Sequence, residues 1–253
     1  MKSAKMGIFF VFLFFIIANL HPSTGRDTEV TCPLCGATVS YWKQFSYSIF
    51  TYGLDLKPIG AARIPQPVPR CENCGFVFIE EYFTDDEINI LRSHIIDESI
   101  FSGRENLPKY YYLAFELELL GNKNYDEMLY FYVCAVWEYS FNKMAVEYME
   151  KNEVENTRGI NFDITIFRFL MQEAVKKINA MSTISEQYNN MQLVKLDFLR
   201  RLGLFEESKM LSEDIKNNEI IYQGIVVDII EYQMELIKNK DIDEHYLEEI
   251  KKE

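Results

Sequence analysis

Two copies of one short pattern constrain this chain more than any other feature. The first copy is Cys32-Pro33-Leu34-Cys35-Gly36, and the second is Cys71-Glu72-Asn73-Cys74-Gly75. In each copy, which we call a knuckle, the Cys-x-x-Cys turn places two thiols on one tight loop, and the glycine permits a positive φ. Two knuckles supply the four ligands of a closed tetrahedral site: Cys32, Cys35, Cys71 and Cys74. The sequence therefore predicts one structural Zn2+ ion, with no coordination position left for a substrate.

Two other chemistries are open to these cysteines. In an oxidising compartment, each pair could form a disulfide. One pair, Cys32/Cys35 or Cys71/Cys74, could instead serve an envelope thiol-disulfide oxidoreductase, in which one cysteine is a low-pKa nucleophile and the other resolves the mixed disulfide. Redox pairs of that kind begin a helix, whereas glycine and then strand-like sequence follow each pair here. Structural zinc is therefore the leading hypothesis.

The first 25 residues differ from the rest of the chain. Lys2 and Lys5 precede residues 7–20, which carry no charge, and a short polar stretch ends at Gly25. This order is typical of a secretory signal peptide cleaved after Gly25. The alternative is an uncleaved membrane anchor, although an apolar helix of 14 residues spans only about 21 Å of a hydrocarbon core of roughly 30 Å. Both alternatives predict export to the periplasm or the exterior, and the second leaves the protein anchored by residues 7–20.

The charge of the chain argues against one common association of zinc ribbons. The formal net charge is −13, and residues 85–253 hold 19 Lys and Arg against 33 Asp and Glu. A surface of this sign repels phosphate backbones, so we expect no nucleic-acid partner. The acidic composition itself is typical of a solvated protein surface and names no particular partner.

Residues 26–84 are predicted to form a small β-rich, zinc-ribbon-like module. Three segments are rich in β-branched and aromatic residues, and the last alternates as a half-buried strand does: residues 37–42, 45–52 and 76–83. Thirty-five residues separate Cys35 from Cys71, and their prolines at positions 65, 67 and 69 favour an extended segment. We predict a rigid connector between the knuckles, with a groove for a partner as the alternative.

Residues 85–253 are predicted to form a mostly helical domain. Thr84 and Glu87 have the spacing of a capping box at the start of a helix over 85–96. Further helices are expected from Leu107 to Gly121, with Tyr112, Phe115 and Leu119 on the buried face, and at residues 126–150, 163–181, 191–202, 208–215 and 219–238. The predicted fold class is therefore α+β.

Two stretches of this helical region share one plan. Residues 112–140 and 188–215 both read as a helix, a glycine turn, an aromatic residue, an acidic pair and a second helix. This plan resembles degenerate tetratricopeptide hairpins, which stack into a concave surface. We therefore expect the helices to bind a peptide or a partner protein.

The chain as a whole resembles a bacterial family known as domain-of-unknown-function family 2225. The resemblance is carried by both knuckles with their flanking residues, by Pro58-Ile59-Gly60, and by Glu80-Glu81-Tyr82-Phe83. It extends from about Glu29 to Ile95 and more loosely to about Asn217. The resemblance implies a zinc-binding module joined to tetratricopeptide-like helices, and it implies no reaction. The export signal is a departure from that family.

The remaining candidates for chemistry predict no catalytic residue. Cys134 lies within an apolar helical pattern and is expected to be buried. His94 and His245 are expected at the surface, and Glu80 and Glu81 are expected to point to opposite faces of a strand. With no Ser/His/Asp set, no phosphate loop and no open metal site, the chain is more readily interpreted as an exported, zinc-stabilised interaction protein than as an enzyme.

Overall fold

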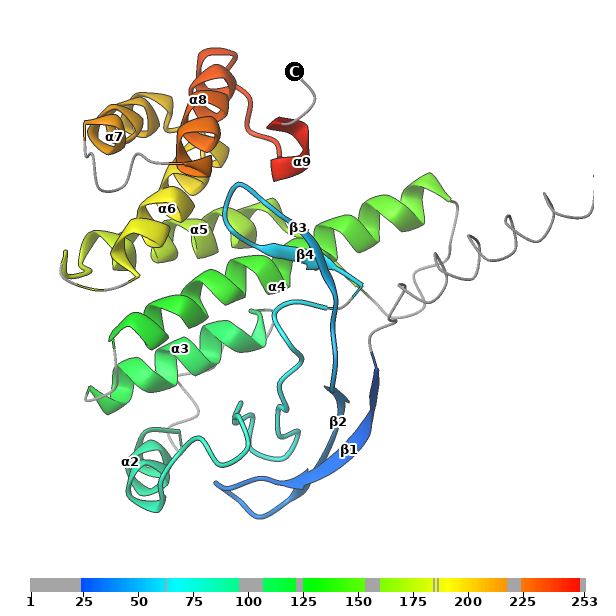
Figure 1. Cartoon of the computed structure of the whole chain (residues 1–253). Helices are drawn as coiled ribbons and strands as arrows, with labels where there is room; N and C mark the ends of the chain where they lie inside the picture. The colour runs from blue at the N-terminus through cyan, green and yellow to red at the C-terminus, as the bar shows by residue number, and fades with distance from the viewer. Residues whose placement is uncertain are drawn as a thin grey trace, which may run out of the picture.

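A computed structural model of the chain places a small β region beside a body of helices (Figure 1). The structure describes residues 24–61, 63–95, 107–121, 125–152, 160–183, 185, 187–217 and 224–250. The expected signal peptide or anchor therefore lies outside the described residues, except for Thr24 and Gly25. Within the described residues the fold is α+β, as the sequence predicts, with four strands between residues 25 and 60 and eight helices from residue 85 onward.

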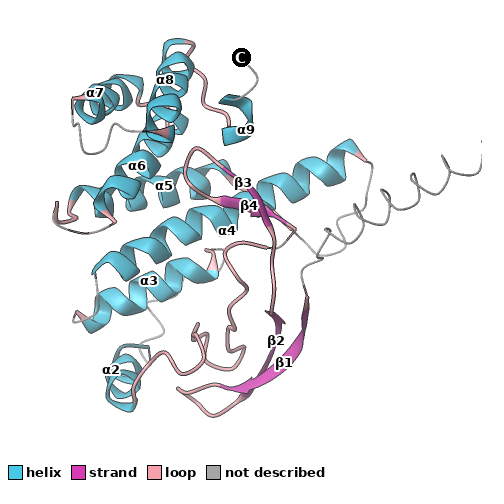
Figure 2. Cartoon of the chain, viewed as in Figure 1, coloured by secondary structure: helices cyan, strands magenta, loops and turns pink. Residues whose placement is uncertain are grey.

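The four strands form two separate antiparallel hairpins (Figure 2). β1 (Gly25–Thr31) pairs along its whole length with β2 (Thr38–Gln44), and the first knuckle connects them. β3 (Ile49–Tyr52) pairs with β4 (Pro58–Gly60). β2 and β3 confirm the strands predicted around residues 37–42 and 45–52, and β1 is an additional strand. The second hairpin also contacts the C-terminal part of the chain, because Gly53 forms a bridge with Tyr246.

The predicted strand at residues 76–83 is wrong. Only Val77 pairs, through one bridge to Arg70, and the chain turns at residues 80–82. The physical reason is burial on both sides of the backbone: Phe76, Val77 and Phe78 are all buried in succession. The rings of Phe76 and Phe78 stack with centroids 5.8 Å apart. The segment is therefore an irregular apolar loop rather than a half-exposed strand.

The first two helices begin where the sequence signals predict. At α2 (Asp85–Ile95), the backbone N–H of Thr84 donates to Glu87 at 2.9 Å, and the N–H of Glu87 donates to the Thr84 hydroxyl at 3.4 Å, which confirms the capping box. α3 (Lys109–Leu120) follows Pro108 and ends at Gly121, whose φ is 65°. This left-handed conformation favours glycine, as expected for a helix C-terminus.

The predicted buried face of α3 is wrong in part. Phe115 and Leu119 are only partly buried, whereas the run Tyr110–Ala114 is buried without interruption. α3 packs against α2 on one side and against α4 on the other. A helix between two others is apolar around most of its circumference, so a single stripe does not describe it.

The later helices pack in chain order, each against the next from α3 to α8 (Figure 1). Their bounds are α4 (Tyr125–Lys151), α5 (Ile164–Asn179), α6 (Tyr188–Arg201), α7 (Phe205–Lys216), α8 (Ile225–Lys238) and α9 (Leu247–Ile250). Of the helix predicted at 219–238, residues 219–223 lie outside the described residues. The short helix α9 is not predicted by the sequence pattern.

Two apolar clusters join the β region to the helices. The larger one contains Cys32, Cys71 and Phe76 together with side chains of α3 to α6. In the smaller one, Leu54 from the loop between β3 and β4 packs with residues of α6, α7 and α8. The connector between the knuckles therefore also docks on the C-terminal helices, a role beyond the predicted delivery of Cys71.

Candidate metal centre

The two knuckles have the same backbone geometry. In the first, the N–H of Cys32 donates to the carbonyl of Ala37 at 2.8 Å, and the N–H of Gly36 donates to the carbonyl of Cys32 at 2.9 Å. In the second, Cys71 bonds in the same way to Phe76, and Gly75 bonds to Cys71, both at 2.8 Å. The φ of both glycines, Gly36 and Gly75, is 76°. The glycines are therefore required by the turn, as the sequence pattern predicts.

The four thiols converge on one point. The Sγ atoms of Cys32 and Cys74 are 3.7 Å apart, and those of Cys35 and Cys71 are 3.5 Å apart. All four lie within 4.8 Å of one another, and all are free thiols. A tetrahedron with metal–sulfur distances of about 2.3 Å has edges of about 3.8 Å. The four cysteines therefore fit a single metal ion, and the donor set suits Zn2+.

The thiols differ in exposure and in acidity. Cys32 and Cys71 are buried, and Cys35 is exposed. A hydrogen bond from the side-chain amide of Asn73, at 3.5 Å, lowers the pKa of Cys35 to about 6. Burial raises the pKa values of Cys32 and Cys74. Cys35 is therefore predisposed to be a thiolate by the protein alone, and a bound cation would favour the ionised forms of Cys32 and Cys74.

Packing against the helices supports both knuckles. Arg92 of α2 donates to the carbonyl of Leu34 in the first knuckle at 3.2 Å. Next to the second knuckle, the guanidinium of Arg70 lies 4.8 Å from the ring centre of Tyr112 in α3. The backbone that presents the thiols is therefore held from outside the turns as well as by them.

Other predicted candidates occupy different places. Cys134 is fully buried and His94 is exposed, as expected. The surface position expected for His245 is wrong, because its side chain is only 17% exposed and its Nδ1 lies 2.6 Å from Glu249. Glu80 is not on a strand; it accepts from Lys43 at 2.8 Å and from Tyr41 at 2.6 Å, which a turn permits.

A buried ionic cluster is the site that the sequence analysis missed. Its six charged side chains come from the β3–β4 loop, α6 and the segment after α8: Asp55, Lys57, Asp197, Arg200, Arg201 and Glu244. Lys57 donates to Glu244 at 3.0 Å and to Ser140 of α4 at 2.7 Å. Positions 197, 200 and 201 have the spacing of ion pairs on a helix, a pattern that usually marks a solvated face.

Arg200 and Arg201 contact the acidic members of this ionic cluster. Arg200 donates to Asp197 at 2.7 Å and to the carbonyls of Asp241 and Asp243 at 2.8 Å. Burial by itself raises the pKa of Asp197, but the charges of Arg200 and Arg201 lower it below its usual value. Burial and then the charge of Asp197 raise the pKa of Asp55 to about 6, although Arg201 opposes this. Three acidic and three basic groups thus hold the β3–β4 loop on the helices.

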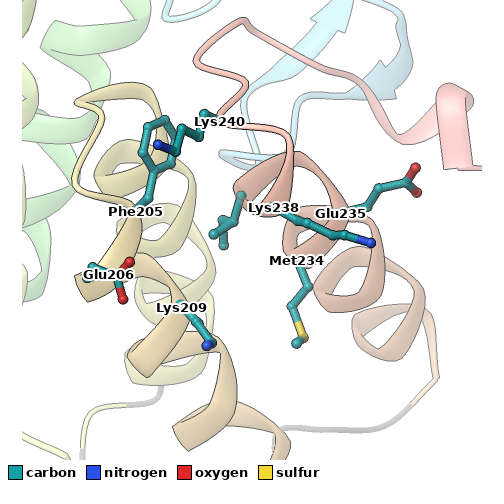
Figure 3. A pocket seen from close by; sticks show the side chains of 8 residues that line it. Phe205, Glu206, Lys209, Met234, Glu235, Lys238 and Lys240 are labelled. Atoms are coloured by element: carbon teal, nitrogen blue, oxygen red, sulfur yellow. The ribbon is translucent and has the colours of Figure 1, made fainter.

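An open groove lies between α7 and α8 at the far end from the knuckles (Figures 1 and 3). Its volume is about 620 Å³, and we call it the α7–α8 groove; it is lined by Phe205, Glu206, Lys209, Met234, Glu235, Ile237, Lys238 and Lys240. The three lysines form no ion pair with another described residue. The groove therefore combines apolar side chains with three lysines and two glutamates, a small excess of positive charge in an acidic protein.

Comparison with known proteins identifies no relative of this chain. No protein-family model, curated protein or solved structure matches the chain. Among the helices of the described residues, none is long and apolar enough to cross a membrane.

Proposed function

We propose that this chain is an exported interaction protein in which one structural Zn2+ ion holds the β region on the helices. The observation that carries the proposal is the convergence of four thiols, with cross-knuckle distances of 3.5 and 3.7 Å. A site with four thiolate ligands is closed to substrate, so its contribution is to folding and orientation. The plan of two helices around a glycine turn, which residues 112–140 and 188–215 share with tetratricopeptide hairpins, supports the interaction role.

Zinc content and thiol reactivity, measured on one sample of the mature protein, test this proposal. We expect one zinc per chain, and five thiols that react only after unfolding in the presence of a chelator, because Cys134 is also buried. A sample with no metal and a single reactive thiol would contain two disulfides, which contradicts the proposal. Re-addition of Zn2+ to the chelated protein should restore its original melting temperature.

The exposed Cys35 thiol, with its lowered pKa, favours a thiol-disulfide oxidoreductase as the second candidate. The geometry around it is less suitable, because β2 rather than a helix follows the first knuckle. Reduction of insulin disulfides by the purified protein distinguishes the two functions. The zinc protein should show no activity, and activity lost in Cys35→Ser would establish the redox function.

For the partner, we propose an acidic peptide segment with apolar side chains that binds in the α7–α8 groove. Lys209 of α7 and Lys238 of α8, together with the apolar side chains of Phe205, Met234 and Ile237, complement such a segment in charge and polarity. The probe is a fluorescein-labelled peptide of Asp, Glu and Leu residues, and binding is followed by its anisotropy. We expect Lys209→Glu with Lys238→Glu to weaken binding at least tenfold. The control, Lys143→Glu with Lys151→Glu on α4, should bind as the wild type does, and equal binding by both variants contradicts this assignment.

A further inference from the structure

The segment from Trp42 to Tyr52, which we call the aromatic arm, exposes an unusual amount of apolar surface. Phe45, Tyr47 and Phe50 are 54%, 50% and 62% exposed, and Trp42, Ile49 and Tyr52 are also exposed. The arm has only one charged residue, Lys43, in a chain whose net charge is −13. Large exposed apolar patches on a protein mark contact with a partner or a membrane.

Thr24 and Gly25, the first described residues of the chain, contact the middle of this arm. The N–H of Thr24 donates to the Ser46 hydroxyl at 3.1 Å, and the carbonyl of Thr24 accepts from the N–H of Phe45 at 2.7 Å. A Cβ atom at Gly25 would lie 2.1 Å from the Trp42 ring, so the ring covers this position closely. Arg26 lies 5.3 Å from the ring centre of Phe45. Cleavage after Gly25 would remove Thr24 and its four hydrogen bonds with Phe45 and Ser46.

The uncharged sequence of residues 7–20 ends only four residues before Thr24. Four residues of extended chain reach at most about 14 Å. In a chain that keeps residues 7–20, Thr24 therefore lies within about 14 Å of the end of this segment, and Thr24 contacts the middle of the arm at Phe45 and Ser46. Each headgroup region of a bilayer is about 5–8 Å thick, so an arm tethered at that distance can reach the interface, where Trp and Tyr side chains are enriched.

We infer that the aromatic arm lies in the headgroup region of a lipid bilayer, beside a retained apolar segment 7–20. The apolar segment and the aromatic arm then bind the membrane together, because stable attachment requires two such contributions. The apolar segment is too short to cross the hydrocarbon core as a helix, and the aromatic side chains add apolar area at the surface. The arm has no carboxylate that a headgroup phosphate would repel.

Fluorescence of Trp42 tests this placement in the full chain. The variant Trp137→Phe leaves Trp42 as the single tryptophan, and it removes an indole N–H that has no hydrogen-bond partner among the described residues. In phosphatidylcholine vesicles, we expect brominated lipids to quench Trp42 and aqueous acrylamide to quench it weakly. The control carries Trp42→Phe, Trp137→Phe and Met210→Trp, which moves the probe to an exposed position of α7, far from β1 and β2 (Figure 1). Its fluorescence should respond to acrylamide alone.

Three outcomes overturn the inference. Equal acrylamide quenching of Trp42 and of the control, with no effect of bromine, would place the arm in water. Protection of Trp42 from both quenchers would indicate a second copy or another protein on the arm. Failure of the protein to associate with vesicles would exclude the bilayer altogether.

A second set of variants measures the contribution of the arm to attachment. Phe45→Ser, Tyr47→Ser and Phe50→Ser, combined in the full chain, should lower vesicle partitioning on the order of 10- to 100-fold. The matched control replaces three exposed apolar residues elsewhere, Met210, Ile225 and Ile242, by serine. Equal partitioning of the two variants contradicts the inference, because residues 7–20 would then suffice.

Discussion

The candidate metal centre and the ionic cluster both join segments that are distant in the sequence, but they do so by different physics. The metal centre brings together two knuckles whose thiols converge within 4.8 Å. The ionic cluster connects Asp55 and Lys57 to α6 and to Glu244, with distances between charged atoms from 2.7 to 3.5 Å. Each lies where the β region meets the helices.

The difference concerns the net free energy that each site contributes. A structural zinc site contributes about 10–16 kcal/mol to the folding of small modules. A buried ionic cluster gains attraction but loses the hydration of its charges, so its net contribution is small, although removal of one member is costly. We therefore expect the metal to determine whether the β region folds, and the ionic cluster to determine where the β3–β4 loop docks.

The largest expected effect comes from the metal centre. Cys71→Ser should remove one ligand and abolish folding of the β region, because the lost free energy is comparable to the total stability of a domain, about 5–15 kcal/mol. Thermal unfolding followed by circular dichroism, with zinc analysis of the same sample, checks this. Cys134→Ala is the matched control and should keep its zinc. A Cys71→Ser protein that melts cooperatively at the wild-type temperature would break the comparison.

The ionic cluster should show the next largest effect. Arg200→Met leaves Asp197 buried beside fewer donors, so we expect the free energy of unfolding to fall by about 3–5 kcal/mol. Urea denaturation measures this fall. Lys209→Met removes an exposed positive charge and should change stability by no more than about 0.5 kcal/mol. If both variants have the same midpoint, the ionic cluster is not a structural element.

A smaller effect should appear in the pH dependence of stability. The pKa of Asp55 in the folded protein, about 6, lies above the value of about 3.9 expected in the unfolded chain. Its contribution to stability is therefore complete below about pH 4 and is lost as the pH rises through about 6, at no more than about 1.4 kcal/mol per pH unit. Asp55→Asn should flatten this slope, measured as urea midpoints at pH 4, 5, 6 and 7. An unchanged slope would show that Asp55 ionises normally.

The smallest effect is expected for the exposed ion pair in the β region. Lys43 and Glu80 are 2.8 Å apart, and their side chains are 37% and 35% exposed. Lys43, followed by Tyr41, lowers the pKa of Glu80. Because solvent screens such pairs, Lys43→Met should cost at most about 1 kcal/mol in urea denaturation. A loss as large as that of Arg200→Met would mean that charge pairs, and not the metal alone, hold the β region.

Local signals in the sequence predicted much of the fold. The capping box at Thr84, the glycine turn at Gly121 and both knuckles act over fewer than six residues, so the nearby sequence specifies them. The strand predicted at residues 76–83 failed because burial on both sides of a loop produces the same composition as a strand. The face predicted for α3 failed because three consecutive tyrosines pack in different directions.

The sequence by itself determined that Cys32, Cys35, Cys71 and Cys74 lie in two matching turns, since the geometry of a Cys-x-x-Cys-Gly turn is contained in five consecutive residues. It also predicted the strands β2 and β3 and the succession of helices from α2 to α8, but not β1, β4 or α9. Only the tertiary structure decided that Asp55 and Lys57 meet Arg201 and Glu244, that His245 is partly buried, and that Thr24 binds the aromatic arm. The contacts of Thr24 and Lys57 join residues that are 22 and 187 positions apart, and no local pattern encodes them because each depends on how separate elements pack.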